Sequence, residues 1–143
     1  MSVPITTSDF TEIRWRGNWI WTETPTIPRD RFAAMRGAFT PQGQAHGLFR
    51  KTFALESVPA RVPARITADS RYLLYVNGRE VNRGPIRSQS RRLHYDMLDL
   101  APYLKAGQNV IAVLVKFYGT TKSYWMPAQP TMTLGRTGVL ILE

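Results

Sequence analysis

Two polar, turn-rich segments carry residue types that could hold a sugar. One supplies planar hydrogen-bonding groups and the other an aromatic pair, so the candidate binding residues are Asn82, Arg83, Arg87, His94, Tyr124 and Trp125. A sugar site needs an aromatic plate against the apolar face of the ring and fixed polar groups for the hydroxyls. The two segments meet that need if they lie at the same end of the fold.

Each candidate also has a structural explanation. Trp125 could be buried against the domain or against another domain, because exposed loop aromatics are commonly interface anchors. The arginines could brace a loop or pair with acids across a domain boundary. His94 could hydrogen-bond to a neighbouring carbonyl. Both interpretations stay open at this point.

The acidic residues do not form a convincing catalytic pair. Hydrolysis of a sugar bond needs two carboxyl groups facing one ring, about 6.5–9.5 Å apart for inversion or about 5–5.5 Å for retention. Asp96 and Asp99 are the nearest interesting pair, but Asp99 is better explained as a helix cap. No Gly-x-Ser-x-Gly elbow presents a serine to His94. We therefore predict no catalytic residue in this chain.

The composition excludes several other classes of site. The chain has 143 residues, of which 43% are hydrophobic and 20% charged, so we expect a packed globular core. It has no Cys and two His, which removes disulfides, thiolate chemistry and an ordinary zinc site. Asp69, Asp96 and Asn109 fit no calcium-ligand spacing. We predict neither a metal nor a cofactor.

The chain is strongly basic, with 19 Lys+Arg against 10 Asp+Glu and a formal net charge of +9. A polyanion partner would suit that charge, but the cations are scattered, and Arg91-Arg92 and Arg50-Lys51 are the only adjacent pairs. A nucleic-acid partner is therefore disfavoured. The missing acid could instead belong to another part of a longer chain.

The apolar residues alternate with period two, which predicts mainly β-strands. Residues 48–56 form a candidate edge strand, because Lys51 interrupts its apolar side. Residues 62–69 alternate cleanly, with Pro63 at an edge or a strand start. Asn77-Gly78 between two short runs predicts a hairpin with a type I′ turn.

The second half of the chain continues this pattern. Residues 82–92 are interpreted as a long exposed loop, and residues 99–104 as one short helical turn capped by Asp99. Residues 110–118 are almost continuously apolar, which favours a central strand covered on both faces. Residues 119–130 form a second loop, and residues 138–142 a last strand.

These elements favour an all-β fold, namely an antiparallel β-sandwich of jelly-roll type with one or two short helical turns. The only other helical candidate is residues 28–35, which is too short to cover a sheet. We expect residues 1–45 to form an N-terminal extension with the first strands, and residues 46–143 the sandwich core. A chain that ends inside an apolar strand is interpreted as a fragment of a longer multidomain protein.

The order of the motifs resembles the N-terminal, galactose-binding-like β-sandwich domain of bacterial α-L-rhamnosidases. The resemblance covers most of residues 15–143 and rests on an ordered series: Trp19-Ile20-Trp21, Phe49-Arg50-Lys51-Thr52-Phe53, residues 64–81, Arg83-Gly84-Pro85 with Arg87-Ser88, Tyr95-Asp96, residues 99–104, and Gly107 with residues 109–115. It implies a catalytic helical toroid further along the parent chain, whose paired acids hydrolyse terminal rhamnose with inversion. No segment here corresponds to that toroid, so no catalytic residue is carried over.

Three functional hypotheses follow. The first is a non-catalytic accessory domain of an α-L-rhamnosidase-type glycoside hydrolase, with the downstream catalytic domain as its partner and rhamnosylated carbohydrate as a candidate ligand. The second is an autonomous carbohydrate-binding module, and the third a polyanion binder that uses residues 79–92. No signal peptide or membrane span is visible, so we expect a cytoplasmic protein without a membrane partner, with a periplasmic or secreted location left open.

Overall fold

A computed structural model describes residues 14–22, 43–86, 93–119 and 137–143. Within these residues it contains seven strands and one 3₁₀ turn, which are β1 (Ala45–Leu55), β2 (Pro63–Asp69), β3 (Arg71–Val76), β4 (Arg79–Gly84), β5 (Asp96–Asp99), η2 (Ala101–Tyr103), β6 (Gly107–Phe117) and β7 (Val139–Leu142). The helical candidate at residues 28–35 and the loop at residues 120–130 lie outside the described residues.

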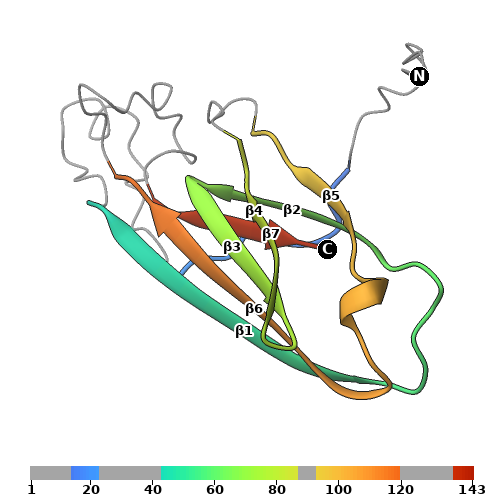
Figure 1. The fold of residues 1–143 in the computed structure, drawn as a ribbon. Helices are drawn as coiled ribbons and strands as arrows, with labels where there is room; N and C mark the ends of the chain where they lie inside the picture. Colours follow the sequence, from blue (N-terminus) through green and yellow to red (C-terminus); the bar gives the residue numbers. More distant parts are fainter. Residues whose placement is uncertain (1–13, 23–42, 87–92, 120–136) are drawn as a thin grey trace, which may run out of the picture.

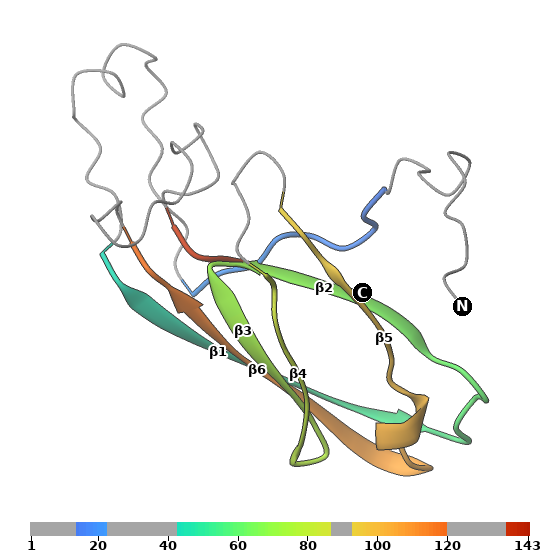
Figure 2. The ribbon, with the colours of Figure 1, turned by 45° about the horizontal axis from the view of Figure 1, so that its top comes forward.

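The strands form two antiparallel sheets, in the orders β1-β6-β3-β4 and β5-β2-β7. Figures 1 and 2 show the two sheets as separate layers, with the 3₁₀ turn between β5 and β6 at one end. The prediction of an all-β antiparallel sandwich is confirmed. In the part of the chain that the structure describes, no helix is long and apolar enough to cross a membrane.

The β6 strand is central in its sheet, as its apolar run predicted. It pairs with β1 on one side and β3 on the other, and β1 lies at the sheet edge, as the interruption at Lys51 indicated. Val113, Val115 and Phe117 face inward and are buried, whereas Leu114 on the opposite face is only half-buried. The expectation that both faces of this strand would be covered is therefore wrong for its outer face.

The core lies between the two sheets. Every second residue of β2 and β3 enters it, with Ile66 and Leu74 fully buried. Pro63 begins β2, so its missing N–H removes no bond from the middle of the strand. The N-terminal segment joins the smaller sheet, because Ile20 forms an antiparallel bridge with Leu140 of β7. Residues on both sides of the expected boundary at residue 45 therefore contact each other.

The hairpin between β3 and β4 has the predicted turn, because Asn77 and Gly78 both have positive φ, at 51° and 80°. Its pairing then shifts by one residue. Tyr75 faces Glu80, but Leu74 faces Asn82, so one residue of β4 is left unpaired as a bulge. The strand also continues to Gly84, so the first residues of the expected loop at 82–92 belong to the sheet instead.

The short helical turn forms one residue later than the cap pattern indicated. Leu100 is its N-cap residue, and Pro102 lies in its first turn. The Asp99 carboxylate nevertheless accepts the backbone N–H of Ala101 at 3.1 Å and that of Val62 at 2.8 Å. These two bonds lower the pKa of Asp99. Asp99 therefore links the 3₁₀ turn to Val62, the residue that precedes β2.

Candidate functional site

Three of the predicted sugar-binding residues lie within the described part of the chain, namely Asn82, Arg83 and His94. Arg87, Tyr124 and Trp125 lie outside the described residues, so their proposed contact with a ligand stays a prediction.

Asn82 faces the interior, where it belongs to a polar contact between the two sheets. Its side-chain amide donates to the Tyr72 hydroxyl at 2.7 Å, and that hydroxyl donates to the Asp96 carboxylate. Tyr72 lies on β3 and Asp96 on β5, so the contact ties the larger sheet to the smaller one. Burial and the neighbouring carboxylate raise the pKa of the Tyr72 phenol well above its usual range. The two hydrogen bonds of this group connect the sheets, and the Tyr72 hydroxyl both accepts and donates one.

Arg83 points the other way, toward the outer face of β4. Its guanidinium makes a two-point ion pair with Glu80, including a 2.9 Å bond from Nη2 to Oε2. That bond is the main reason why the pKa of Glu80 is lowered. Since Asn82 and Arg83 lie on opposite faces of one strand, the structure does not bring their side chains together.

His94 precedes β5 and is exposed. Its backbone carbonyl accepts the hydroxyl of Thr67 at 2.6 Å. The alternation of β2 places Thr67 on the face of the strand opposite the core, yet Thr67 is only 1% exposed. Because a buried hydroxyl needs a hydrogen-bond partner, the His94 carbonyl satisfies it. The contact made by His94 is therefore a backbone contact between β2 and the approach to β5.

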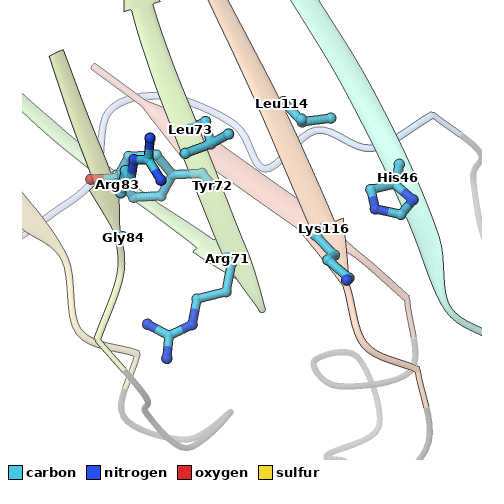
Figure 3. A pocket seen from close by; sticks show the side chains of 8 residues that line it. All are labelled: His46, Arg71, Tyr72, Leu73, Arg83, Gly84, Leu114 and Lys116. Atoms are coloured by element: carbon cyan, nitrogen blue, oxygen red, sulfur yellow. The ribbon is translucent and has the colours of Figure 1, made fainter. Parts of the chain in front are cut away.

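A shallow groove on the outer face of the larger sheet is the best candidate for a binding site. It has a volume of about 350 Å³ and is lined by His46, Arg71, Tyr72, Leu73, Arg83, Gly84, Leu114 and Lys116. Figure 3 shows His46, Lys116 and Arg71 on three neighbouring strands, with Leu114 and Leu73 one row further along β6 and β3.

The strand register places His46, Lys116 and Arg71 in one row. His46 of β1 pairs with Lys116 of β6, and Lys116 pairs with Arg71 of β3. One N–H of the Arg71 guanidinium donates to the carbonyl of Pro85, and Lys116 Nζ lies 5.4 Å from the ring centre of Tyr118. Arg83 is neutralised by Glu80, so Arg71 and Lys116 provide the charge of the groove.

This arrangement suits binding rather than catalysis. Lys and Arg side chains offer only hydrogen-bond donors, and none of the described residues that line the groove carries a carboxyl group. The described lining therefore lacks the pair of carboxyl groups that glycoside hydrolysis needs. The sequence alone did not indicate this site, because alternation assigns each residue to a face, whereas only the register between strands makes His46, Lys116 and Arg71 neighbours.

Most described carboxylates have a structural partner. Asp69 accepts the Ser70 hydroxyl at 2.9 Å, and Glu143 accepts the backbone N–H of Arg16 at 2.7 Å and that of Gly17 at 3.0 Å. Glu143 also pairs with Arg65 of β2. Among the described residues, no group of three His, Asp or Glu side chains could hold a metal ion.

A second cavity of about 420 Å³ opens between the sheets, beside β1 and β7. Its walls are mainly apolar, and Asn18, Arg50 and Lys51 are the polar residues among the described lining. It contains no carboxyl group among its described lining residues either.

Comparisons with known proteins show that the structure of this chain is similar to parts of solved rhamnosidase structures. No family model matches the chain, and no curated protein matches it in sequence. Among solved structures, a GH78 family rhamnosidase of Bacillus sp. GL1 matches with a TM-score of 0.66 and 32% sequence identity over 92% of this chain. An α-L-rhamnosidase from Dictyoglumus thermophilum matches with a TM-score of 0.59 and 19% identity over 90% of this chain, which supports the fold alone.

The chain spans 12% and 14% of the length of these two proteins. Each match therefore corresponds to one domain-sized part of a much larger chain. The structural comparison confirms the resemblance that the ordered motifs indicated: this chain is similar to a β-sandwich domain of GH78 α-L-rhamnosidases.

Proposed function

We propose that this chain is a non-catalytic accessory domain of an α-L-rhamnosidase-type glycoside hydrolase. Its parent protein would hydrolyse terminal α-L-rhamnosides in a catalytic domain further along the chain. The sandwich would be of the jelly-roll, galactose-binding-like type. The observation that carries this proposal is the 32% identity and common fold over 92% of the chain, matched to 12% of a GH78 rhamnosidase.

The carboxylates support the non-catalytic part of the proposal. A glycosidase acid must be free to reach the glycosidic oxygen, and its partner must face the sugar or a water. Asp96 is bonded to the buried Tyr72 hydroxyl, Asp99 to two backbone N–H groups, and Glu143 to two others. Moving any of these carboxylates to a substrate would break bonds that hold the sandwich together.

The test is an assay of the purified 143-residue chain on an aryl α-L-rhamnoside. We expect no release of the aryl group above the rate in buffer. Sustained turnover by the chain, abolished by Asp96→Asn, would contradict the proposal.

The parent activity is tested separately. The complete reading frame that encodes this chain is expressed and assayed on the same substrate, and we expect hydrolysis. The proposal of a parent enzyme would be wrong if that reading frame ended at residue 143, or if the complete product left aryl rhamnosides intact.

Carbohydrate binding is a second candidate function, which the groove of His46, Lys116 and Arg71 favours. The domain could use it within the parent enzyme or as an autonomous module. Titration with rhamnose and with rhamnosylated oligosaccharides tests this function, and Trp125→Ala tests the aromatic contact predicted from the sequence. Absence of binding to any sugar would favour a purely architectural role.

A further inference from the structure

We propose that the row of His46, Lys116 and Arg71 binds the carboxylate of an acidic saccharide, such as a uronate. The choice of a saccharide as carrier rests on the proposed function. The choice of an anion rests on the structure of the groove alone.

The first argument is the repulsion within the row. Lys116 and Arg71 are direct partners on antiparallel strands, where Cβ atoms lie about 4.5–5.5 Å apart. Like charges at such positions destabilise a sheet. In the described part of the chain, the ion pairs are Arg61–Asp99, Arg65–Glu143 and Arg83–Glu80, and none of them neutralises this row. Figure 3 shows the charged ends of the two side chains directed apart, which relieves part of this repulsion, and an anion lying over the row between them would be attracted by both.

The second argument is that the row is held in place. The bond from Arg71 to the Pro85 carbonyl uses one of the five guanidinium N–H groups and fixes the direction of the side chain. Lys116 is half-buried on β6, and its ammonium group lies over the Tyr118 ring. The groups therefore lose less side-chain entropy on binding an anion than freely moving surface cations would.

The third argument concerns the size of the ligand. Adjacent strands lie about 4.7–4.9 Å apart, so a row across three strands spans about 10 Å. With a volume of about 350 Å³ the groove fits one or two sugar rings. Leu73 and Leu114 beside the row offer apolar surface to the C–H groups of a pyranose. A nucleic acid would need a longer track of cations than this row provides.

The experiment is a titration of the whole chain with D-glucuronate and with D-glucose, which differ by the carboxylate. Backbone amide shifts in NMR spectra report the binding. We expect glucuronate to shift amides of β3 and β6 with millimolar affinity, and glucose to leave them unchanged. Lys116→Gln should weaken glucuronate binding about tenfold, because it removes one charge-assisted contact, and Lys116→Arg should restore most of it.

Lys51→Gln is the matched control. It removes the same charge from the neighbouring strand β1, but Lys51 borders the cavity between the sheets instead of the groove. We expect it to bind glucuronate as the unchanged chain does. Thermal unfolding of both variants shows whether they are folded, so that a loss of binding can be assigned to the groove.

Three outcomes would overturn the proposal. Equal shifts with glucose and glucuronate would show that the carboxylate is not recognised. Acetate or inorganic phosphate binding as tightly as glucuronate would show that the sugar is not recognised. Tighter binding of a short DNA duplex, with a steep dependence on salt, would favour a polyanion partner. None of these outcomes affects the rhamnoside assays, so the proposed function stands or falls separately.

Discussion

Gly84 is the residue whose replacement tests the packing of the two sheets most directly. It lies at the end of β4, opposite Tyr72 and against Asp96 of the other sheet. A Cβ atom added there would lie 2.1 Å from Asp96 Oδ2 and 2.9 Å from the Tyr72 hydroxyl oxygen. Glycine is needed here because of the close approach of the sheets, since its φ is not positive.

The expected cost of Gly84→Ala has two parts. Overpacking a well-filled site costs about 1–3 kcal/mol. If the Asp96 carboxylate moves away to make room, the bond from Tyr72 is lost as well, and a hydrogen bond to a charged group contributes about 1.5–3 kcal/mol. If both parts apply, we expect a loss of about 2.5–6 kcal/mol in the free energy of unfolding. For a domain of this size, this loss corresponds to a fall in Tm of about 8–18 °C.

Urea unfolding followed by circular dichroism, together with thermal unfolding, measures this loss. Gly43→Ala is the control, because nothing lies within 4 Å of a Cβ atom at that position. It should change stability by no more than about 0.5–1 kcal/mol. The double variant Gly84→Ala/Tyr72→Phe separates the two parts of the cost. If the broken bond matters, Gly84→Ala should cost at least about 1 kcal/mol less when Tyr72 is already Phe.

A Gly84→Ala variant as stable as Gly43→Ala would refute this reasoning. It would mean that the two sheets do not approach closely at Asp96. Additive effects in the double variant would instead leave overpacking as the whole cost and remove the role of the hydroxyl bond.

Three further substitutions test the polar groups of the sandwich. Asn77→Gly keeps the positive φ of the turn but removes side-chain bonds to the Tyr103 carbonyl, the Asn109 side chain and the Val110 N–H. It should lower the free energy of unfolding, measured in urea, by about 1–3 kcal/mol. An unchanged free energy of unfolding would show that the backbone turn alone suffices. Backbone N–H groups lower the pKa of Asp99, so the unfolded chain takes up protons first as the pH falls below about 4, and stability is lost there. Asp99→Asn should therefore be less stable at pH 7 and should lose less stability on acidification. An acid unfolding profile equal to that of the unchanged chain would contradict this. Burial raises the pKa of Asp69, so its effect on stability has the opposite sign, and stability falls as the pH rises above about 4. Asp69→Asn should remove that fall. A variant less stable than the unchanged chain at pH 7 would show that the charged form is needed.

The sequence was a good guide wherever the physical cause is local. Alternation along residues 62–69 predicted β2 and its inward residues, because successive side chains of a strand point to opposite faces. Asn77-Gly78 predicted the turn, because both positions require positive φ. The long apolar run predicted that β6 is central. These features are enough for the fold class, whereas the resemblance to rhamnosidase domains rests on the ordered series of motifs.

The candidate groove could not be predicted in this way. Arg71, His46 and Lys116 are separated by long stretches of sequence, and only the pairing of β1, β6 and β3 makes them neighbours. The tie between Tyr72 and Asp96 likewise depends on two sheets meeting, which no local pattern specifies. The prediction of binding residues rests on the residue types in two polar segments, and residue type does not determine the direction of a side chain.

Asn82 and Arg83 show most clearly which features the sequence determines and which depend on the tertiary structure. The sequence by itself determined that these adjacent residues follow a type I′ turn and point to opposite faces of any strand they form. Which of the two faces the core was decided only in the folded sheet, by the one-residue shift between Leu74 and Tyr75. The physical reason is that a bulge exchanges the two faces of the strand beyond it, so Asn82 reaches Tyr72 inside and Arg83 pairs with Glu80 outside.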